Sequence, residues 1–150
     1  MNMNETIAAI EAEITRVKKD NLRQKNEMEE INLNHERQID SLINDFIGVI
    51  DAFEKAETKV KELGLDEDEK AQKVLKRMNQ PKKIALSVLS KYNVSRIDLD
   101  GKMMDENLCT VVDTEPDPSK EDGFVLSIEK NGYVRGERLI RRAEVIIVRN

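Results

Sequence analysis

The stretch from Ile7 to Leu63 decides the fold, because its apolar residues follow one another at steps of three and four. Side chains at this spacing lie on one face of an α-helix. No proline interrupts the stretch, so the sequence predicts one helix from Asn4 to about Leu63. We call this stripe the seam. It consists of Ile7, Ile10, Ile14, Val17, Asn21, Gln24, Met28 and Ile31, followed by His35, Ile39, Leu42, Phe46, Val49, Phe53, Ala56, Val60 and Leu63.

The length of this helix predicts a partner. At ~1.5 Å per residue it would span on the order of 80 to 90 Å. A chain of 150 residues cannot build a core along all of it, so the seam needs a second helix. Another copy of the chain is the simplest one, which predicts a homodimeric coiled coil. The residues expected at the dimer interface are those from Ile7 to Ile31 in the seam, with Leu42, Phe46, Val49 and Phe53.

Three seam positions are polar. Asn21 and Gln24 would form layers that fix the register at a cost in stability, and they meet their own copies only if the two helices run parallel. His35 is interpreted as a tolerated polar layer, with a pH sensor or a metal ligand as the alternative.

A second helix is predicted after a short break. Gly64 offers a left-handed cap for the first helix, and Asp66 with Glu69 predicts the start of the second. Pro81 lies inside this helix, but the apolar phase is the same on both sides of it, which favours one kinked helix over two. Gly48 in the first helix could mark a bend or a close packing contact. Two helical segments per chain would give a four-helix bundle in a dimer.

Beyond Asn93 the pattern changes to short extended pieces. Strands are predicted over 94–99, 108–112, 124–129 and 139–148, the last two facing each other across a glycine-rich turn at 131–137. The sequence thus predicts an α+β fold in three parts. These are a coiled-coil helix over 1–41, a helical dimerisation bundle over 42–93 and a small β-rich domain over 94–150.

Composition excludes several classes of function. The net charge of −5 and the pI of about 5.1 argue against nucleic acid as the main ligand. No run approaches the ~18 apolar residues of a membrane span, and no secretory signal is visible, so we expect a cytoplasmic protein without a membrane partner. The single Cys109 excludes an intramolecular disulfide and is expected to be a small packing residue. No catalytic, cofactor-binding or metal-binding constellation appears, so we expect no enzyme.

The arginines of the last region do not by themselves decide between a solvated face and a binding site. They are Arg135, Arg138, Arg141, Arg142 and Arg149.

Two runs of residues resemble the GrpE family. The run 132–148 resembles its signature, G-Y-x-x-x-G-R-x-[LI]-R-x-A-x-V-x-V, with matches at Gly132, Tyr133, Arg138, Ile140, Arg141, Ala143, Val145 and Ile147. The run 42–51, with Glu54-Lys55-Ala56 after it, is similar to the family's L-L-x-D-L-L-P-V-L-D and D/E-R-A. Weaker likenesses are Asn21-Leu22-Arg23 in the long helix and Met104-Asp105 with Val112.

The resemblance implies a homodimeric nucleotide exchange factor for a DnaK-type chaperone. In that family the β-domain acts as a wedge in the chaperone's ATPase domain, so that ADP leaves, and melting of the coil is thought to slow exchange during heat stress. This is a population shift and not covalent catalysis. Residue-by-residue matching gives the expected chaperone contacts Arg138, Ile147, Val145, Lys55, Arg23 and Arg141. The alternative is a structural or adaptor coiled coil whose β module binds another protein.

The chain departs from the family pattern at a few positions. Gly48 stands where the family has proline, and Arg77 where the second helix usually has glycine. Glu106 and Cys109 replace a proline and a histidine, and Glu137 replaces the signature glycine. These departures concern the fine geometry of partner contact and not the architecture.

Overall fold

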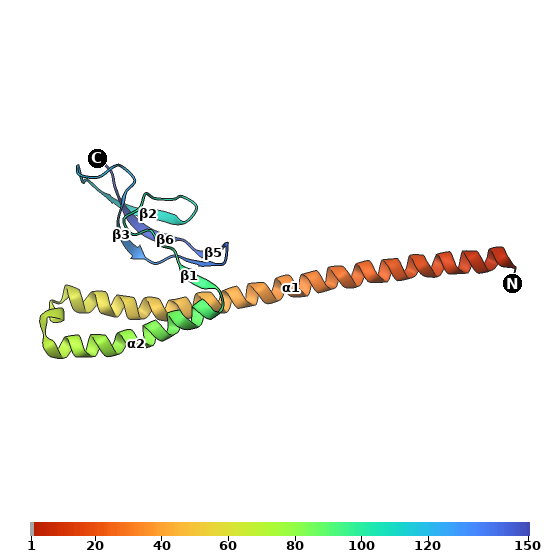
Figure 1. Cartoon of the computed structure of the whole chain (residues 1–150), viewed down its shortest axis with the longest axis horizontal. Coiled ribbons are helices and arrows are strands. Elements are labelled where there is room, and N and C mark those ends of the chain that lie inside the picture. The colour runs from red at the N-terminus through yellow and green to blue at the C-terminus, as the bar shows by residue number, and fades with distance from the viewer. Residues whose placement is uncertain (1) are drawn as a thin grey trace. The chain divides into compact units, whose positions relative to one another are not determined.

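Helix α1 (Met3–Glu62) is continuous through Gly48, as the uninterrupted seam predicts (Figure 1). The computed structural model describes residues 2–150, and their contacts form two compact units that divide between Ser41 and Leu42. In the first unit the apolar seam side chains are exposed, for example Ile10 at 54% and Met28 at 65%. This stripe is therefore available to a partner helix.

The turn between the helices corrects one prediction. Gly64 adopts the expected left-handed conformation with φ 66°, which confirms the end of α1. Asp66, however, is not the cap of the next helix, because it lies in the short 3-10 helix η1 (Leu65–Glu67). The cap is Asp68, whose carboxylate accepts a hydrogen bond from the backbone N–H of Lys70 at 2.9 Å. Four acidic residues in a row look alike in sequence, and one tight turn moves the cap by two residues.

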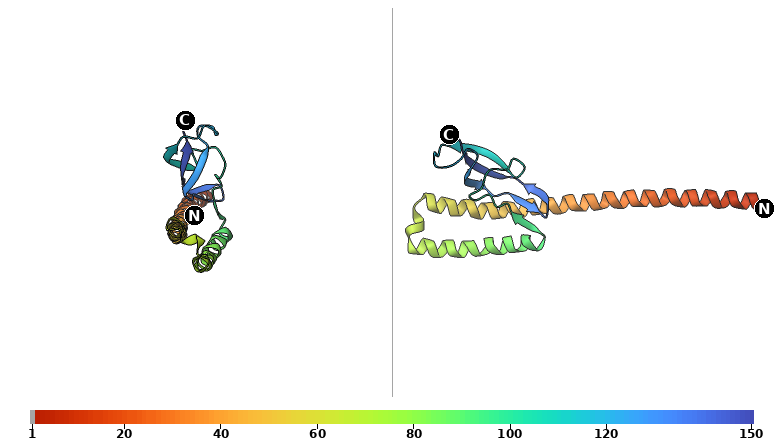
Figure 2. Two further views of the ribbon diagram at one scale, coloured as in Figure 1. Left: turned by 90° about the vertical axis from the view of Figure 1, so that its left-hand side faces the viewer. Right: turned by 45° about the horizontal axis from the view of Figure 1, so that its top comes forward.

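Helix α2 (Glu69–Lys91) is a single helix that includes Pro81. It runs back beside the C-terminal part of α1 (Figure 2). Ala85 and Leu89 pack in one cluster with Ile43, Ile47 and Ile50 of α1. Glu57 and Lys82 join the two helices by a hydrogen bond of 2.6 Å, which lowers the pKa of the Glu57 carboxyl.

The β-rich segment forms two three-stranded sheets. The first is antiparallel and has the order β1-β4-β5, with β1 (Val94–Arg96), β4 (Tyr133–Arg135) and β5 (Arg138–Arg141). The second has the order β2-β6-β3, with β2 (Cys109–Glu115), β6 (Ala143–Val148) and β3 (Val125–Lys130). Its central strand β6 runs parallel to β2 and antiparallel to β3.

Two predictions about the last strands are wrong. The run 139–148 is not one strand, because the extended structure is interrupted at Arg142 and β5 and β6 belong to different sheets. The expected turn at 131–137 contains strand β4. Both errors have one cause, since a run rich in β-branched residues and a glycine-rich turn do not reveal which sheet each piece joins. The β3–β6 pairing itself is antiparallel, as predicted.

The first sheet is the middle layer of the second unit. Tyr133 and Val94 pack in one cluster with Ile47 and Ile50 of α1 and with Leu89 of α2. The next residue along β4, Val134, packs instead into a second cluster with Ile97, Leu99, Cys109, Val125, Ala143 and Val145. Successive side chains of a strand point to opposite faces, so this alternation places helices on one side and the second sheet on the other. Cys109 is buried, as its predicted packing role requires.

We expect Gly132→Ala to destabilise the protein by about 2 to 4 kcal/mol, because overpacking cannot relax against backbone. A Cβ at Gly132 would collide with the backbone N of Ala143, and would lie 2.8 Å from Ile97 Cδ1 and 2.9 Å from the carbonyl oxygen of Arg141. The matched control is Gly48→Ala, where nothing lies within 4 Å of an added Cβ. In that helix interior alanine should stabilise by roughly 0.5 to 1 kcal/mol. Chemical denaturation at one protein concentration measures both, and equal effects would contradict the described packing.

Candidate functional site

Arg141 of β5 binds Asp51 of α1 through two parallel hydrogen bonds. Nη1 donates to Oδ2 at 2.6 Å and Nη2 donates to Oδ1 at 2.8 Å. Both side chains are largely buried, with exposed fractions of 20% for Arg141 and 17% for Asp51. The same guanidinium donates to the carbonyl oxygen of Asn131, from Nη2 at 2.7 Å and from Nε at 3.1 Å. The Asp51 bond raises the pKa of the Arg141 guanidinium, although burial works against it.

A second set of contacts lies beside this pair. Glu54, three residues after Asp51, accepts hydrogen bonds from Arg96 Nη2 and from Asn131 Nδ2, the latter at 3.1 Å. Arg96 Nε donates to the hydroxyl of Tyr133 at 3.3 Å. Burial is the main cause that raises the pKa of this fully buried phenol.

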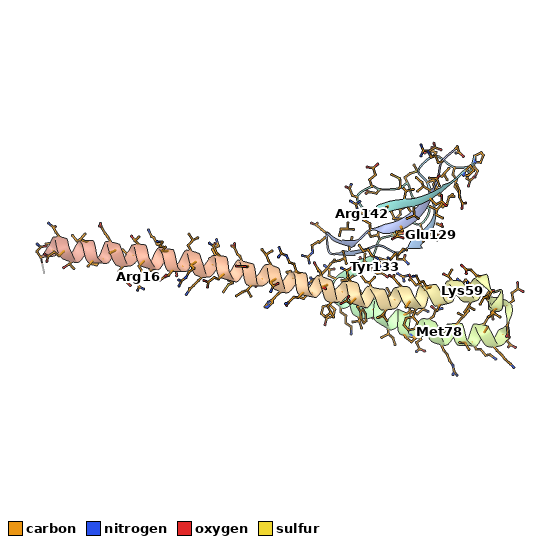
Figure 3. The ribbon with its side chains drawn as sticks, turned by 180° about the vertical axis from the view of Figure 1, so that it is seen from behind. Arg16, Lys59, Met78, Glu129, Tyr133 and Arg142 are labelled. Carbon is orange, nitrogen blue, oxygen red and sulfur yellow. The ribbon has the colours of Figure 1, made fainter. Side chains whose placement is uncertain are left out.

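These contacts form one network between the helix and the strands. The guanidinium carbon of Arg141 lies 5.5 Å from the centroid of the Tyr133 ring. Figure 3 shows Tyr133 where the strands meet α1. We call the network the clasp, and its members are Asp51, Glu54, Arg96, Asn131, Tyr133 and Arg141.

Sequence reasoning quoted most of the clasp residues but did not predict that they meet. Asp51 and Glu54 belong to one motif of the resemblance, and Tyr133 and Arg141 belong to the other. A signal was present, because the two carboxylates continue the helix face that Ile47 and Ile50 bury. Charged groups that lie on the buried face of a helix usually need an opposite charge or a hydrogen-bond partner. Nothing in the sequence identified those partners as Arg96, Asn131 and Arg141.

The structure divides the expected chaperone contacts into exposed and internal residues. Arg138 is exposed at the start of β5, an edge strand of the first sheet, and the next residue, Leu139, is 38% exposed. Ile147 of β6 is half-buried against the second core. Val145 has no exposed surface. Its side chain fills the core that shapes the second sheet, and its role as a chaperone contact stays a prediction.

Lys55 is exposed on α1 beside a groove. The groove has a volume of about 650 Å³ and is bounded by α1 on one side and by β3 and β6 on the other. Its walls carry both charges, from Lys55 and Lys59 on the helix and from Glu129, Lys130 and Glu144 on the strands. Lys59 and Glu129 are visible in Figure 3. Such a mixed lining suits contact with a protein surface better than capture of an apolar ligand.

Arg23 belongs to the first unit and is exposed. Its guanidinium lies 3.7 Å from carboxylate oxygens of Asp20 and Glu27 on the same helix. Ion pairs this exposed contribute little to stability.

The seam continues into the second unit. Leu42 and Val49 are exposed there, at 69% and 50%. Phe46 is half-buried against the first core, and its outer side lies beside Pro81, Ile84 and Val88 of α2. Phe53 is half-buried. An apolar surface therefore extends over both helices.

Neither a metal site nor a membrane-spanning helix is found in the part of the chain that the structure describes. Within residues 2–150, no three His, Cys, Asp or Glu side chains are grouped so that they could hold a metal ion. The helices of the same range contain no stretch long and apolar enough to cross a bilayer.

Comparison with known proteins identifies the family. The family model GrpE matches residues 1–149. Protein GrpE from Francisella tularensis subsp. holarctica (strain OSU18) is 29% identical over 157 residues, an alignment that covers 97% of this chain and 76% of that protein. Protein GrpE from Hydrogenovibrio crunogenus is 26% identical over 132 residues, covering 85% of this chain and 66% of that protein. The chain therefore belongs to the GrpE family, a family of co-chaperones and not of enzymes.

Proposed function

We propose that this protein binds the ATPase domain of a DnaK-type chaperone and promotes the release of ADP. It would act as a homodimeric nucleotide exchange factor in the cytoplasm, in protein folding and in the response to heat stress. The observation that carries the proposal is the family match over residues 1–149, which extends through both units of the structure. No cofactor, nucleic acid or membrane is part of it.

The proposed mechanism uses binding energy alone. The β-sheets bind the conformer of the ATPase domain in which the nucleotide cleft is open, and the population shifts to that conformer. A shift from 1:99 to 99:1 requires about 10⁴-fold tighter binding to the open state, or about 5.5 kcal/mol. A contact surface of ordinary size can supply this difference.

The exposed members of the expected contact set support a surface on the β-sheets and the adjoining helix. We propose Arg138 as the principal contact, together with Ile147 on β6, Lys55 at the groove and Arg23 on the first unit. Arginine suits such a role because its planar guanidinium binds a carboxylate through two bonds.

The proposed dimer rests on the exposed seam. Ile7, Ile10, Ile14, Val17, Met28 and Ile31 each expose more than two-fifths of their surface. An apolar stripe of this length on a solvent-facing helix is typical of a coiled coil whose partner is a second helix.

We expect Arg138→Ala to reduce the stimulated release of labelled ADP from the cognate chaperone by at least about tenfold. Truncating an arginine that pairs with a carboxylate in a desolvated interface costs roughly 2 to 5 kcal/mol, and each 1.4 kcal/mol is a factor of about ten. The control is Arg149→Ala, which removes an exposed arginine of the same domain outside the family signature. Both variants should keep the wild-type mass and melting profile. Unchanged release by Arg138→Ala would remove Arg138 from the contact surface, and no release by the wild type would favour an adaptor function.

We expect the coiled coil to melt before the β-rich domain on heating. The double variant Asn21→Ile with Gln24→Leu should raise the temperature of this first transition, because apolar layers replace polar ones in the seam. The protein should sediment as an elongated dimer before and after the change. The control variant carries Lys19→Leu and Asn26→Leu, which lie on the helix face opposite to the seam. A compact monomer in sedimentation, or equal shifts in both variants, would contradict the proposed coiled coil.

A further inference from the structure

Two kinds of contact attach the β-sheets to α1, and they differ in directionality. The apolar cluster of Ile47, Ile50, Val94 and Tyr133 supplies attraction without a preferred angle. The clasp is directional, because two parallel N–H···O bonds between a guanidinium and a carboxylate form in only one relative orientation. Of the two kinds of contact, the clasp is therefore the one whose geometry specifies an angle between the sheets and the helix.

The segment that carries the clasp has little freedom to move. Asn131 contributes both a donor to Glu54 and an acceptor to Arg141. Gly132 follows it and is packed so closely against Ile97 and the carbonyl of Arg141 that a Cβ would not fit. Its carbonyl oxygen accepts a bond from the backbone N–H of Ile97 at 2.9 Å, which links the segment to the end of β1. A displacement of the sheets relative to α1 would break together the bonds that reach the helix, which run from Asn131 and Arg96 to Glu54 and from Arg141 to Asp51.

We propose that Asp51 and Arg141 are positioning residues for nucleotide release. Their bond holds the sheets at one angle on α1, so that binding of the chaperone is converted into opening of its nucleotide cleft. This inference rests on the proposed function. It also reassigns Arg141, because the guanidinium that the family match suggested as a chaperone contact is engaged with Asp51 and Asn131 inside the fold.

The physical reason is that the bound sheets can hold the nucleotide cleft open only if they do not tilt on α1. Sheets held by apolar contacts alone could still bind the ATPase domain, but they could tilt with it and leave the cleft closed. The binding energy would then no longer distinguish the open from the closed conformer, and no population shift would follow. Loss of the clasp should therefore reduce the maximal rate of release more than the affinity.

The test titrates the full-length protein against the cognate chaperone loaded with fluorescent ADP. Asp51→Asn places an amide donor opposite the guanidinium, and Arg141→Lys keeps the charge but cannot make two parallel bonds. In both variants we expect the maximal release rate to fall at least about threefold, while the half-saturating concentration changes less than about twofold. The control is Glu67→Gln, which removes an exposed carboxylate of η1 and should change neither quantity.

A second measurement reports the position of the sheets relative to α1 in the absence of the chaperone. Spin labels at Lys59→Cys on α1 and Arg142→Cys between β5 and β6 are combined with Cys109→Ala. Both labelled positions are exposed and are shown in Figure 3. The distribution of distances between the labels should broaden in Asp51→Asn and Arg141→Lys but not in Glu67→Gln. If Asp51→Asn does not fold, Arg141→Lys decides by itself.

Either of two results would overturn the proposal. One is an unchanged maximal release rate in a folded variant. The other is a higher half-saturating concentration with full release at saturation, which would make Arg141 a direct contact. Absence of release by the wild type would instead refute the proposed function, and the label distances would still show whether the clasp fixes the angle.

Discussion

The paired hydrogen bonds between Asp51 and Arg141 are the interaction on which the rest of the second unit depends. The two residues are 90 positions apart in the chain. Their bond joins α1 to β5, the edge strand of the first sheet that directly precedes β6 of the second sheet. Because each group is mostly buried, removal of one would leave the other as an uncompensated charge, at a cost of roughly 3 to 5 kcal/mol. The pair therefore constrains where β5 can lie, and with it the first sheet.

The layered packing follows from this constraint. Tyr133 faces the helices while Val134 faces the second sheet, so strand β4 contributes to both cores. The first sheet can serve as a middle layer only if β5 is aligned with α1, and the second sheet is built on β6, which follows β5 after Arg142. Exposed Arg138 lies on the same short strand as Arg141. The residue proposed to meet the chaperone is thus three positions from the residue that fixes the strand on the helix.

Much of this architecture could be predicted from local patterns, and the remainder depends on contacts between distant residues. The seam defined α1, and Gly64 marked its end because only glycine adopts that backbone conformation readily. The division of 139–148 into two strands was missed, since the run is rich in β-branched residues and sheet membership is not a local property. Val145 was predicted as a chaperone contact from its motif position, whereas its burial depends on how β6 packs between β2 and β3. The clasp was missed because no residue in it has an unusual local pattern except the two carboxylates of α1.

A double-mutant cycle on Asp51 and Arg141 tests the central claim most directly. Asp51→Ala, Arg141→Ala and the double variant are unfolded in denaturant at one protein concentration, and the interaction energy is taken from the three changes in the free energy of unfolding. A partly buried bond between two charged groups predicts a coupling of about 1.5 to 3 kcal/mol. Additive effects, with a coupling below about 0.5 kcal/mol, would contradict the account, because two side chains that do not constrain each other cannot fix the angle of the sheets.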